Sequence, residues 1–193
     1  MAHKDEIKWN KKYQDIPSLL ETREASNKLI SILDHVIGTS ALDVACGAGR
    51  NAIYLASKGF NVLALDISKI ALEELNNKGI KNITAKYVDL DEYDIPKNSY
   101  DLIVMTNFLD RNLIPNLAMA LKKDGILFIE TYMDHEVNEK PPSNTGFLLK
   151  KGELKDFFDD KFEVVDYEEY LNGNEEMYKM MKQSISVRKL WKD

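Results

Sequence analysis

The sequence predicts an α/β domain in which a mostly parallel sheet is covered by helices on both faces. Apolar runs typical of strands alternate with amphipathic runs typical of helices, which is the pattern of βαβ units. The strand-like runs are continuously apolar, as in parallel strands that are buried on both faces. The 193 residues are enough for one domain with a substantial core and short for two.

Five strands are expected in the centre of the chain. They are "SALDVACG", "FNVLALDIS", "NITAKYVDL", "YDLIVMTNF" and "GILFIETYM". Helices are expected at "NAIYLASKG", "SKIALEELNNKG" and "LIPNLAMALKKDG", the last with Pro115 in its first turn. Ser68 is a plausible N-cap, and Gly59 and Gly79 follow the ends of the first two helices. The residues expected to face the core from these two helices are Ile53, Tyr54, Ala56, Ile70, Leu72 and Leu75.

Further helices and strands are expected before and after these five strands. A helix-rich lead comes first, and its apolar residues recur at helical spacing: Leu29, Ile30, Leu33, Val36 and Ile37. After the fifth strand, a polar connection and a helical "KKGELKDFF" lead to two strands joined at "NGN", which predict an antiparallel pair. We therefore expect a single domain over 1–193, with a helical lead or lid at 1–37, a cofactor-binding core at 38–132, and a substrate-side connection and C-terminal hairpin at 133–193.

Composition excludes several classes of protein. The net charge is −6 and there is no basic tract, so a nucleic-acid partner is not expected and a small-molecule ligand is favoured. Cys46 is the only cysteine, so no internal disulfide can form. The charged N-terminus lacks an apolar signal segment, and no apolar run approaches the roughly 20 residues of a membrane span. These features predict a cytoplasmic protein without membrane contact; we predict no metal site, and the oligomeric state is open.

The stretch "ALDVACGAGRNAIYLA" carries the clearest functional signal. Gly47 and Gly49 lie between the first strand and the following helix, where they allow the backbone to approach a ligand closely. The free N–H groups at the start of that helix favour an anionic group. Asp66 and Asp89 end the next two strands, and a carboxylate at such a position can accept both ribose hydroxyls. These features predict an adenosine-containing ligand, against the alternative that both aspartates are only helix caps or turn residues.

Two features argue against a dinucleotide, although "GAGRNA" fits the dinucleotide fingerprint G-x-G-x-x-G/A. Asp43 lies four residues before Gly47, where a further negative charge would oppose a pyrophosphate. The fingerprint also comes late, in a chain too short for a separate substrate domain. A ligand that combines an ammonium, a carboxylate and an adenosine explains Asp43 better.

The motif and the strand after it, "LDVACGAGRNAIYLASKGFNVLALDIS", resemble the class I S-adenosylmethionine-dependent methyltransferases. Within this class the chain is most similar to the tellurite-resistance-type branch, whose members carry D-x-x-C-G-x-G-R-N-x-x-x-L-A. "WNKKY", "VDLDEY", "NFLDRNLIPNLAMALKKDGILFIETY" and "NTGFLLKKGEL" also resemble that branch, so the likeness runs from Trp9 to about Phe158. It implies a Rossmann-like methyltransferase fold, a mostly parallel seven-stranded sheet with an antiparallel C-terminal strand, and S-adenosyl-L-methionine as cofactor.

The resemblance also implies roles for individual residues. Asp66 would hold the ribose, and Arg50 would meet the cofactor carboxylate or a substrate anion. The full set implied to bind the cofactor is Asp43, Ala45, Cys46, Gly47, Gly49, Arg50, Asn51, Asp66, Ile67, Asp89, Leu90, Thr106 and Asn107. Ala45 departs from the class, in which many members have glycine.

The C-terminal region departs further from the branch. Tellurite-acting members tend to carry His and Arg residues in the final hairpin, whereas "DYEEYLNGNEEMYKMMKQSISVRKL" has no His and only Arg188. An oxyanion substrate is therefore in doubt, and the acceptor nucleophile is open among thiol, chalcogen, oxygen and nitrogen.

Methyl transfer is an in-line displacement at the sulfonium methyl, so a soft anionic acceptor needs no base, whereas a hydroxyl or amine needs one. The weak candidates for such a group follow the fifth strand: Glu130, Tyr132 and His135. Glu130 is expected either to face the pocket or to be paired, and His135 to be a solvated loop residue. No base is evident beside Cys46, so a nucleophilic cysteine is not expected.

Three residues are candidates for substrate contact or for a lid. Trp9 and Tyr13 share a face of the first helix, which either packs on the core or closes over the cofactor. Arg111 either binds an acceptor anion or pairs with Asp110, and we favour the pair.

Two other functions stay open on the sequence alone. A nicotinamide-dependent reductase is favoured only by "GAGRNA", since "YKMMK" matches the Tyr-x-x-x-Lys pair of short-chain dehydrogenases but lies in a strand-like tail. The second is a non-catalytic S-adenosylmethionine-binding protein. It would have the same cofactor-binding residues as an enzyme, so the sequence does not separate the two.

Overall fold

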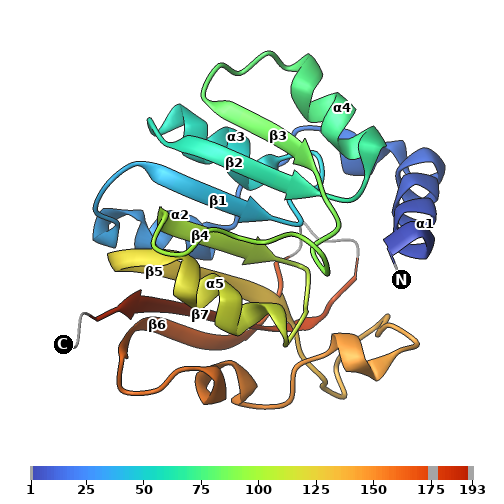
Figure 1. Ribbon diagram of the computed structural model, residues 1–193. Helices are drawn as coiled ribbons and strands as arrows, with labels where there is room; N and C mark the ends of the chain where they lie inside the picture. The colour runs from blue at the N-terminus through green and yellow to red at the C-terminus, as the bar shows by residue number, and fades with distance from the viewer. Residues whose placement is uncertain (1, 174–177, 191–193) are drawn as a thin grey trace.

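A single seven-stranded sheet forms the centre of the molecule (Figure 1). The structure is a computed structural model that describes residues 2–173 and 178–190. The strand order is β3-β2-β1-β4-β5-β7-β6, in which β1 to β5 are parallel and β7 runs antiparallel to both β5 and β6. The strands are β1 Ser40–Val44, β2 Asn61–Asp66, β3 Ile83–Tyr87, β4 Tyr100–Thr106, β5 Leu121–Tyr132, β6 Phe162–Leu171 and β7 Met181–Lys189. The expected parallel sheet with an antiparallel C-terminal pair is confirmed.

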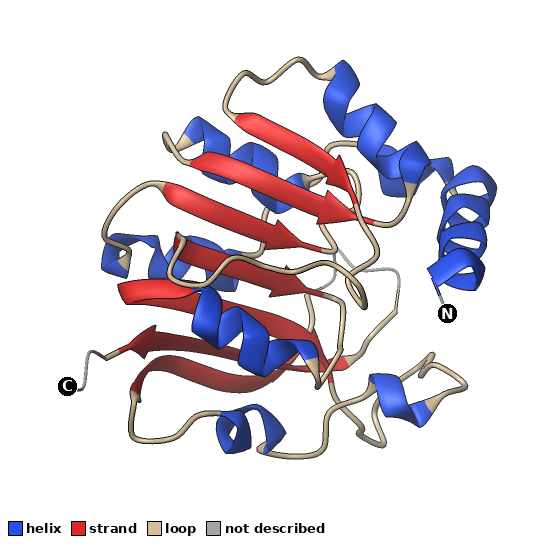
Figure 2. Cartoon of the chain, viewed as in Figure 1, coloured by secondary structure: helices blue, strands red, loops and turns tan. Residues whose placement is uncertain are grey.

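Helices cover both faces of this sheet (Figure 2). They are α1 Ala2–Asp15, α2 Asn27–Ile32, α3 Arg50–Ser57, α4 Lys69–Asn77 and α5 Leu113–Ala120, with short 3-10 helices η1 Pro17–Leu20, η2 Leu33–His35, η3 Thr145–Phe147 and η4 Glu153–Phe157. Leu29 of α2 and Leu55 of α3 pack with Phe128 on one face, while Ile114 and Leu117 of α5 pack on the other. α1 lies beyond the arrowheads of the parallel strands, at the edge where ligands bind in such sheets (Figure 1).

The buried face of α3 differs from the prediction. Ala52, Leu55 and Ala56 are buried, whereas Ile53 and Tyr54 are only half-buried. The buried Asp43 carboxylate accepts a hydrogen bond from the Ala52 N–H, which turns Ala52 towards the sheet and fixes the rotation of the helix. In α4, Ser68 is the N-cap as predicted, and Leu72 and Leu75 are buried with Ala71, while Ile70 is half-buried.

The helical lead is shorter than its apolar spacing predicted. α2 ends at Ile32, which is buried in place of Ile30, and Ile37 is 68% exposed. Gly38 ends the segment with a φ of +94°, and an added Cβ there would lie 2.5 Å from the Asp101 carboxyl carbon. The Asp101 carboxylate accepts hydrogen bonds from Thr39 N and Ser40 N, so the chain turns into β1 before a further helical turn can form.

The C-terminal elements mostly follow the prediction. "KKGELKDFF" forms the 3-10 helix η4 rather than an α-helix. Of "NGN", Asn172 and Gly173 follow the end of β6, and Asn174 lies outside the described residues. Asn172 holds the start of the return segment, because its side-chain oxygen accepts from Met180 N and its amide donates to the Tyr178 carbonyl.

Leu29→Ala tests how α2 is held on the sheet. Leu29 is fully buried, so the truncation is expected to lower the free energy of unfolding by about 2–5 kcal/mol through lost burial and a cavity. Ile37→Ala removes an exposed side chain of similar size and is expected to change stability by less than about 0.5 kcal/mol. Urea unfolding followed by circular dichroism measures both, and equal losses would contradict this placement of α2.

Candidate cofactor site

The segment from Ala45 to Gly49 forms a tight loop at the carboxyl end of β1. Three of its residues have positive φ: Ala45 at 53°, Gly47 at 56° and Gly49 at 84°. Cys46 N donates to the Leu65 carbonyl at 2.9 Å, which ties the loop to β2. Glycine adopts this conformation at low cost, whereas Ala45 carries a steric cost of about 1–2 kcal/mol. The loop therefore lies at the predicted position, after β1. Ala45, which stands where many class members have glycine, adopts its positive φ at a cost in conformational energy.

Both glycines of the loop are in close contact with other elements. A Cβ on Gly47 would lie 2.7 Å from the Tyr13 hydroxyl oxygen, and a Cβ on Gly49 would lie 2.5 Å from a Leu75 methyl carbon. Tyr13 comes from α1 and Leu75 from α4. The two glycines thus let the first helix and α4 pack directly against the loop.

Asp66 connects the loop to the next helix. Its carboxylate accepts one hydrogen bond from Gly47 N and another from Ser68 N, each at 2.7 Å. The side chain is buried, which raises the pKa of Asp66, while the N–H groups of Ser68, Gly47 and Ile67 act in the opposite direction. Asp66 therefore ends β2 beside the loop, and backbone donors from the loop and from the start of α4 hold it.

Asp43 is buried more deeply, below the loop. Its carboxylate accepts from Ala52 N at 3.0 Å in the first turn of α3. Burial raises the pKa of Asp43 to about 7, against the opposing effects of the Ala52 hydrogen bond and the nearby Arg50 charge. This carboxyl supports the helix that follows the loop, and it is only 1% exposed.

The first helix is fastened over this edge of the sheet. The Asn10 side-chain oxygen accepts from the Ser68 hydroxyl at 2.8 Å, and Glu6 both pairs with Lys69 at 3.0 Å and accepts from the Tyr87 hydroxyl at 2.9 Å. Trp9 and Tyr13 lie side by side on this helix, with ring centroids 6.2 Å apart. Burial, followed by the Asp66 and Cys46 charges, raises the pKa of Tyr13.

A chain of buried hydrogen bonds extends from α3 across the sheet. The Asn51 side chain donates to the Thr106 hydroxyl at 2.9 Å and accepts from Ser26 N at 3.1 Å. The Ser26 hydroxyl donates to Glu130 at 2.5 Å. Asn51 and Thr106 are thus brought together beside the loop, as members of one network with Glu130.

Glu130 is paired. Besides Ser26, its carboxylate lies 3.5 Å from Lys182 Nζ and 3.9 Å from Arg50 Nη2, and the side chain is 3% exposed. Lys182 also lies over the Tyr132 ring, at 4.8 Å from its centroid. Sequence reasoning missed Ser26 and Lys182: a serine before a helix is an N-cap signal, whereas no pattern marks a lysine in a C-terminal strand.

Two buried polar atoms beside the loop have no hydrogen-bond partner. They are Arg50 Nη2 and the Asn107 side-chain oxygen. Asn107 follows β4 with a φ of +55°, held by a hydrogen bond from its N–H to the Glu130 carbonyl at 2.8 Å. A donor and an acceptor that both lack a hydrogen bond thus stand at the carboxyl ends of neighbouring strands, and leaving them so is costly unless a ligand binds them.

The other predicted positions lie where the strands end. Asp89 and Leu90 follow β3, Asp89 accepts from Asp91 N at 3.0 Å, and Leu90 packs partly on the core. Ile67 and Cys46 are half-buried beside Asp66 and in the loop. Burial raises the pKa of the Cys46 thiol, which disfavours the thiolate. His135 is exposed, and its Nδ1 accepts from Val137 N, so it caps a turn.

Arg111 does not pair with Asp110, contrary to the prediction. Its guanidinium binds the Glu153 carboxylate through Nε at 2.5 Å and Nη2 at 3.1 Å, and it donates to the carbonyls of Gly146 and Leu148. Asp110 instead accepts from Asn112 N. Glu153 lies 42 residues away in the sequence, so local spacing could not predict this pair. Arg111 thereby fixes the connection after β5.

No group of three or more His, Cys, Asp or Glu side chains in residues 2–173 and 178–190 is placed to bind a metal ion. Within the same residues, no helix has the length and apolar character required to cross a membrane.

Comparison with known proteins decides the family. Residues 1–186 match the family described as tellurite resistance protein TehB. The chain belongs to the TehB family. One relative, from Haemophilus influenzae, is named "Probable S-adenosyl-L-methionine-dependent methyltransferase TehB" and is 31% identical over 139 residues, which are 66% of this chain and 47% of the relative. A ubiquinone biosynthesis O-methyltransferase from Rickettsia typhi is 32% identical over 97 residues, which are 47% of this chain and 39% of that protein.

Solved structures show the same fold as this TehB-family chain. The crystal structure of TehB from Haemophilus influenzae superimposes with a TM-score of 0.73 at 24% identity, covering 86% of this chain and 62% of that one. A methyltransferase from Methanosarcina mazei gives 0.68 at 19% identity, covering 88% and 100%. The expected Rossmann-like methyltransferase fold is confirmed. The chain spans about half the length of its TehB relative from H. influenzae.

Asp43→Asn tests the buried carboxyl through the pH dependence of stability. The folded chain holds the Asp43 proton up to about pH 7, whereas the unfolded chain releases it near the ordinary value of 3.8. The carboxyl therefore stabilises the fold fully below that value, and its contribution is lost as the pH rises towards 7. Relative to Asp43→Asn, the free energy of unfolding of the wild type should fall by up to about 4 kcal/mol over that range.

Urea titrations at several pH values between about 4 and 7.5 measure this difference. Asp91→Asn, at an exposed carboxyl, is the matched control and should leave the pH profile unchanged. A constant difference between wild type and Asp43→Asn would show that folding does not raise the pKa of Asp43.

Proposed function

We propose that this TehB-family chain binds S-adenosyl-L-methionine and transfers its methyl group to a small-molecule acceptor. The observation that carries the proposal is a pair of buried atoms that lack a hydrogen-bond partner within the described residues: Arg50 Nη2, which has only the 3.9 Å ion pair with Glu130, and the Asn107 oxygen. One is a cationic donor and the other an acceptor. A methionyl group, with one carboxylate and one ammonium, supplies the partner that each of them lacks.

The remaining residues fit the adenosine part. Asp66 uses one lone pair of each oxygen for Gly47 N and Ser68 N, which leaves lone pairs for two ribose hydroxyls. Ile67 and Leu90 offer apolar surface for the adenine, and Asp89 accepts from its amino group. Asn51 and Thr106 are bonded to each other, so their role is to shape the methionyl end rather than to contact it.

The bound cofactor supplies a methyl group activated by its sulfonium. The protein's part is alignment and exclusion of water. Trp9 and Tyr13 close the site from α1, which is held to Ser68, Lys69 and Tyr87. Because Glu130 is bound by Ser26, Arg50 and Lys182, it is not placed to take a proton from an acceptor. This favours a thiol or chalcogen acceptor that enters as an anion over oxygen or nitrogen nucleophiles, which need a base.

Family membership disfavours the nicotinamide-dependent reductase, which rested on "GAGRNA" alone. The non-catalytic cofactor-binding protein remains the alternative. A structure titled as the [4+2]-cyclase SpnF shares the fold with a TM-score of 0.67, so the fold alone does not establish methyl transfer. Turnover of an acceptor in the presence of cofactor separates the two.

The cofactor is tested by heats of binding. We expect S-adenosylmethionine and S-adenosylhomocysteine to bind the wild type with micromolar affinity, whereas NADH does not bind. Asp66→Asn should weaken binding by about 10- to 100-fold, because a charged acceptor is lost while the side-chain volume is kept. Asp91→Asn is the control. NADH binding without S-adenosylmethionine binding would exclude the proposed cofactor.

The lid is tested on Tyr13, whose hydroxyl lies against Gly47. Tyr13→Ala should accelerate release of S-adenosylhomocysteine at least about tenfold, because the ring that covers the loop is removed. Tyr13→Phe keeps the ring, so its rate of S-adenosylhomocysteine release should lie between those of the wild type and Tyr13→Ala. Stopped-flow release experiments measure these rates. Equal rates in all three proteins would show that the helix only packs on the core.

A further inference from the structure

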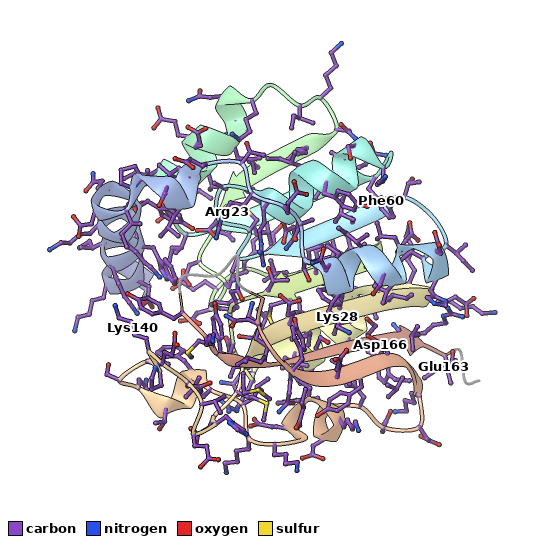
Figure 3. All side chains as sticks on the ribbon, turned by 180° about the vertical axis from the view of Figure 1, so that it is seen from behind. Arg23, Lys28, Phe60, Lys140, Glu163 and Asp166 are labelled. Atoms are coloured by element: carbon purple, nitrogen blue, oxygen red, sulfur yellow. The ribbon has the colours of Figure 1, made fainter. Side chains whose placement is uncertain are left out.

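Four cations lie on the side of the molecule that carries α1: Lys8 and Lys12, whose Nζ atoms lie 5.9 and 4.5 Å from the same Trp9 ring centroid, and Arg23 and Lys140 (Figure 3). Lys8 and Lys12 come from α1, Arg23 from the segment before α2, and Lys140 from the connection after β5. Within the described part of the chain, none of these four has a carboxylate at ion-pair distance. We call them the cation group. The chain as a whole has a net charge of −6, so this concentration of positive charge is local.

The charges of the other three members of the cation group all act on Lys12. The pKa of Lys12 is lowered, first by desolvation and then by the charges of Lys8, Arg23 and Lys140. Arg23 also acts on the Tyr13 hydroxyl, which lies against the glycine loop. Arg23 and Lys140 lie on the side of the molecule that carries α1 (Figure 3). An anion placed among these side chains would relieve their mutual repulsion.

Aromatic rings are interleaved with the cations. Lys12 Nζ lies 4.5 Å from the Trp9 ring centroid and Lys8 Nζ lies 5.6 Å from that of Phe147, while Lys140 Nζ lies 4.6 Å from the Tyr178 centroid and donates to the Tyr178 hydroxyl at 3.0 Å. Phe147 is 47% exposed and Tyr178 is 37% exposed, so both rings offer apolar surface to a ligand. This edge therefore combines positive charge with apolar rings.

We propose that the cation group and the rings of Trp9 and Phe147 recognise the methyl acceptor as an amphiphilic organic anion. Its carboxylate, sulfonate or phosphate group binds Lys12, Arg23 and Lys140, and its apolar body lies against the rings. This inference rests on the proposed function, because it assigns the acceptor of the same site. A small inorganic anion meets only the charges, and a neutral apolar molecule meets only the rings, so each binds more weakly.

The probe pair for the test is 8-anilinonaphthalene-1-sulfonate and N-phenyl-1-naphthylamine, which share their rings and differ in the sulfonate. Trp191→Phe leaves Trp9 as the only tryptophan, so energy transfer from Trp9 reports binding beside α1. We expect the sulfonate to bind at least about tenfold more tightly than the neutral probe, and inorganic sulfate to compete only at far higher concentration.

Lys12→Gln/Lys140→Gln removes two positive charges from the cation group, and we expect it to weaken sulfonate binding about tenfold. Lys97→Gln/Lys123→Gln makes the same charge change at exposed lysines elsewhere and should have little effect. Heats of S-adenosylmethionine binding, measured on the same proteins, keep a failure of the cofactor proposal distinct from a failure of this one.

Selective sulfonate binding that is lost only in the Lys12/Lys140 variant supports the proposal. Equal affinity for the two probes, or equal losses in the two double variants, overturns it even if S-adenosylmethionine binds normally. Sedimentation with phosphatidylglycerol vesicles tests membrane lipid as the alternative ligand. If Lys12 and Lys140 govern vesicle binding but not sulfonate binding, this edge contacts membrane lipid instead, and the proposal fails.

Discussion

The geometry of the site depends on the two hydrogen bonds that the buried Asp66 carboxylate accepts. Its two hydrogen bonds join Gly47, in the loop after β1, to Ser68, at the start of α4. Ser68 is also the residue to which Asn10 of α1 is bonded. One buried side chain therefore holds the loop, a helix N-terminus and the covering helix in a fixed relation. These two hydrogen bonds use one lone pair of each Asp66 oxygen and leave the second lone pair of each.

Buried charge is balanced around the site rather than avoided. Glu130 is compensated by Lys182 and Arg50 and by the Ser26 hydroxyl, as a desolvated carboxylate requires. Asp43 meets the same demand differently: its pKa rises until the proton is retained near neutral pH. Both carboxyls are buried, Asp43 with 1% and Glu130 with 3% of its surface exposed, so little solvent screens their effect on the electrostatic potential at the loop.

The sequence predicted the sheet well because buried parallel strands are marked by continuous apolar runs and by glycines where helices end. It also predicted the loop and Asp66, since both lie at strand ends. Contacts between distant segments were not predictable in this way. The pairing of Arg111 with Glu153, and of Glu130 with Ser26 and Lys182, depends on how the connection after β5 and the final strand fold back. The rotation of α3 was missed because a buried carboxylate, and not apolar spacing, fixes it.

The docking of α1 has a consequence for the order in which the chain becomes structured during synthesis. Residues 2–15 are synthesised before the residues that hold them, which are Gly47, Ser68, Lys69 and Tyr87. The helix has no surface to dock on until β1, β2, α4 and β3 have emerged. Trp9 and Tyr13 of the nascent chain therefore stay without this docking surface until the chain has been synthesised as far as Tyr87, and a chaperone can bind them during that interval.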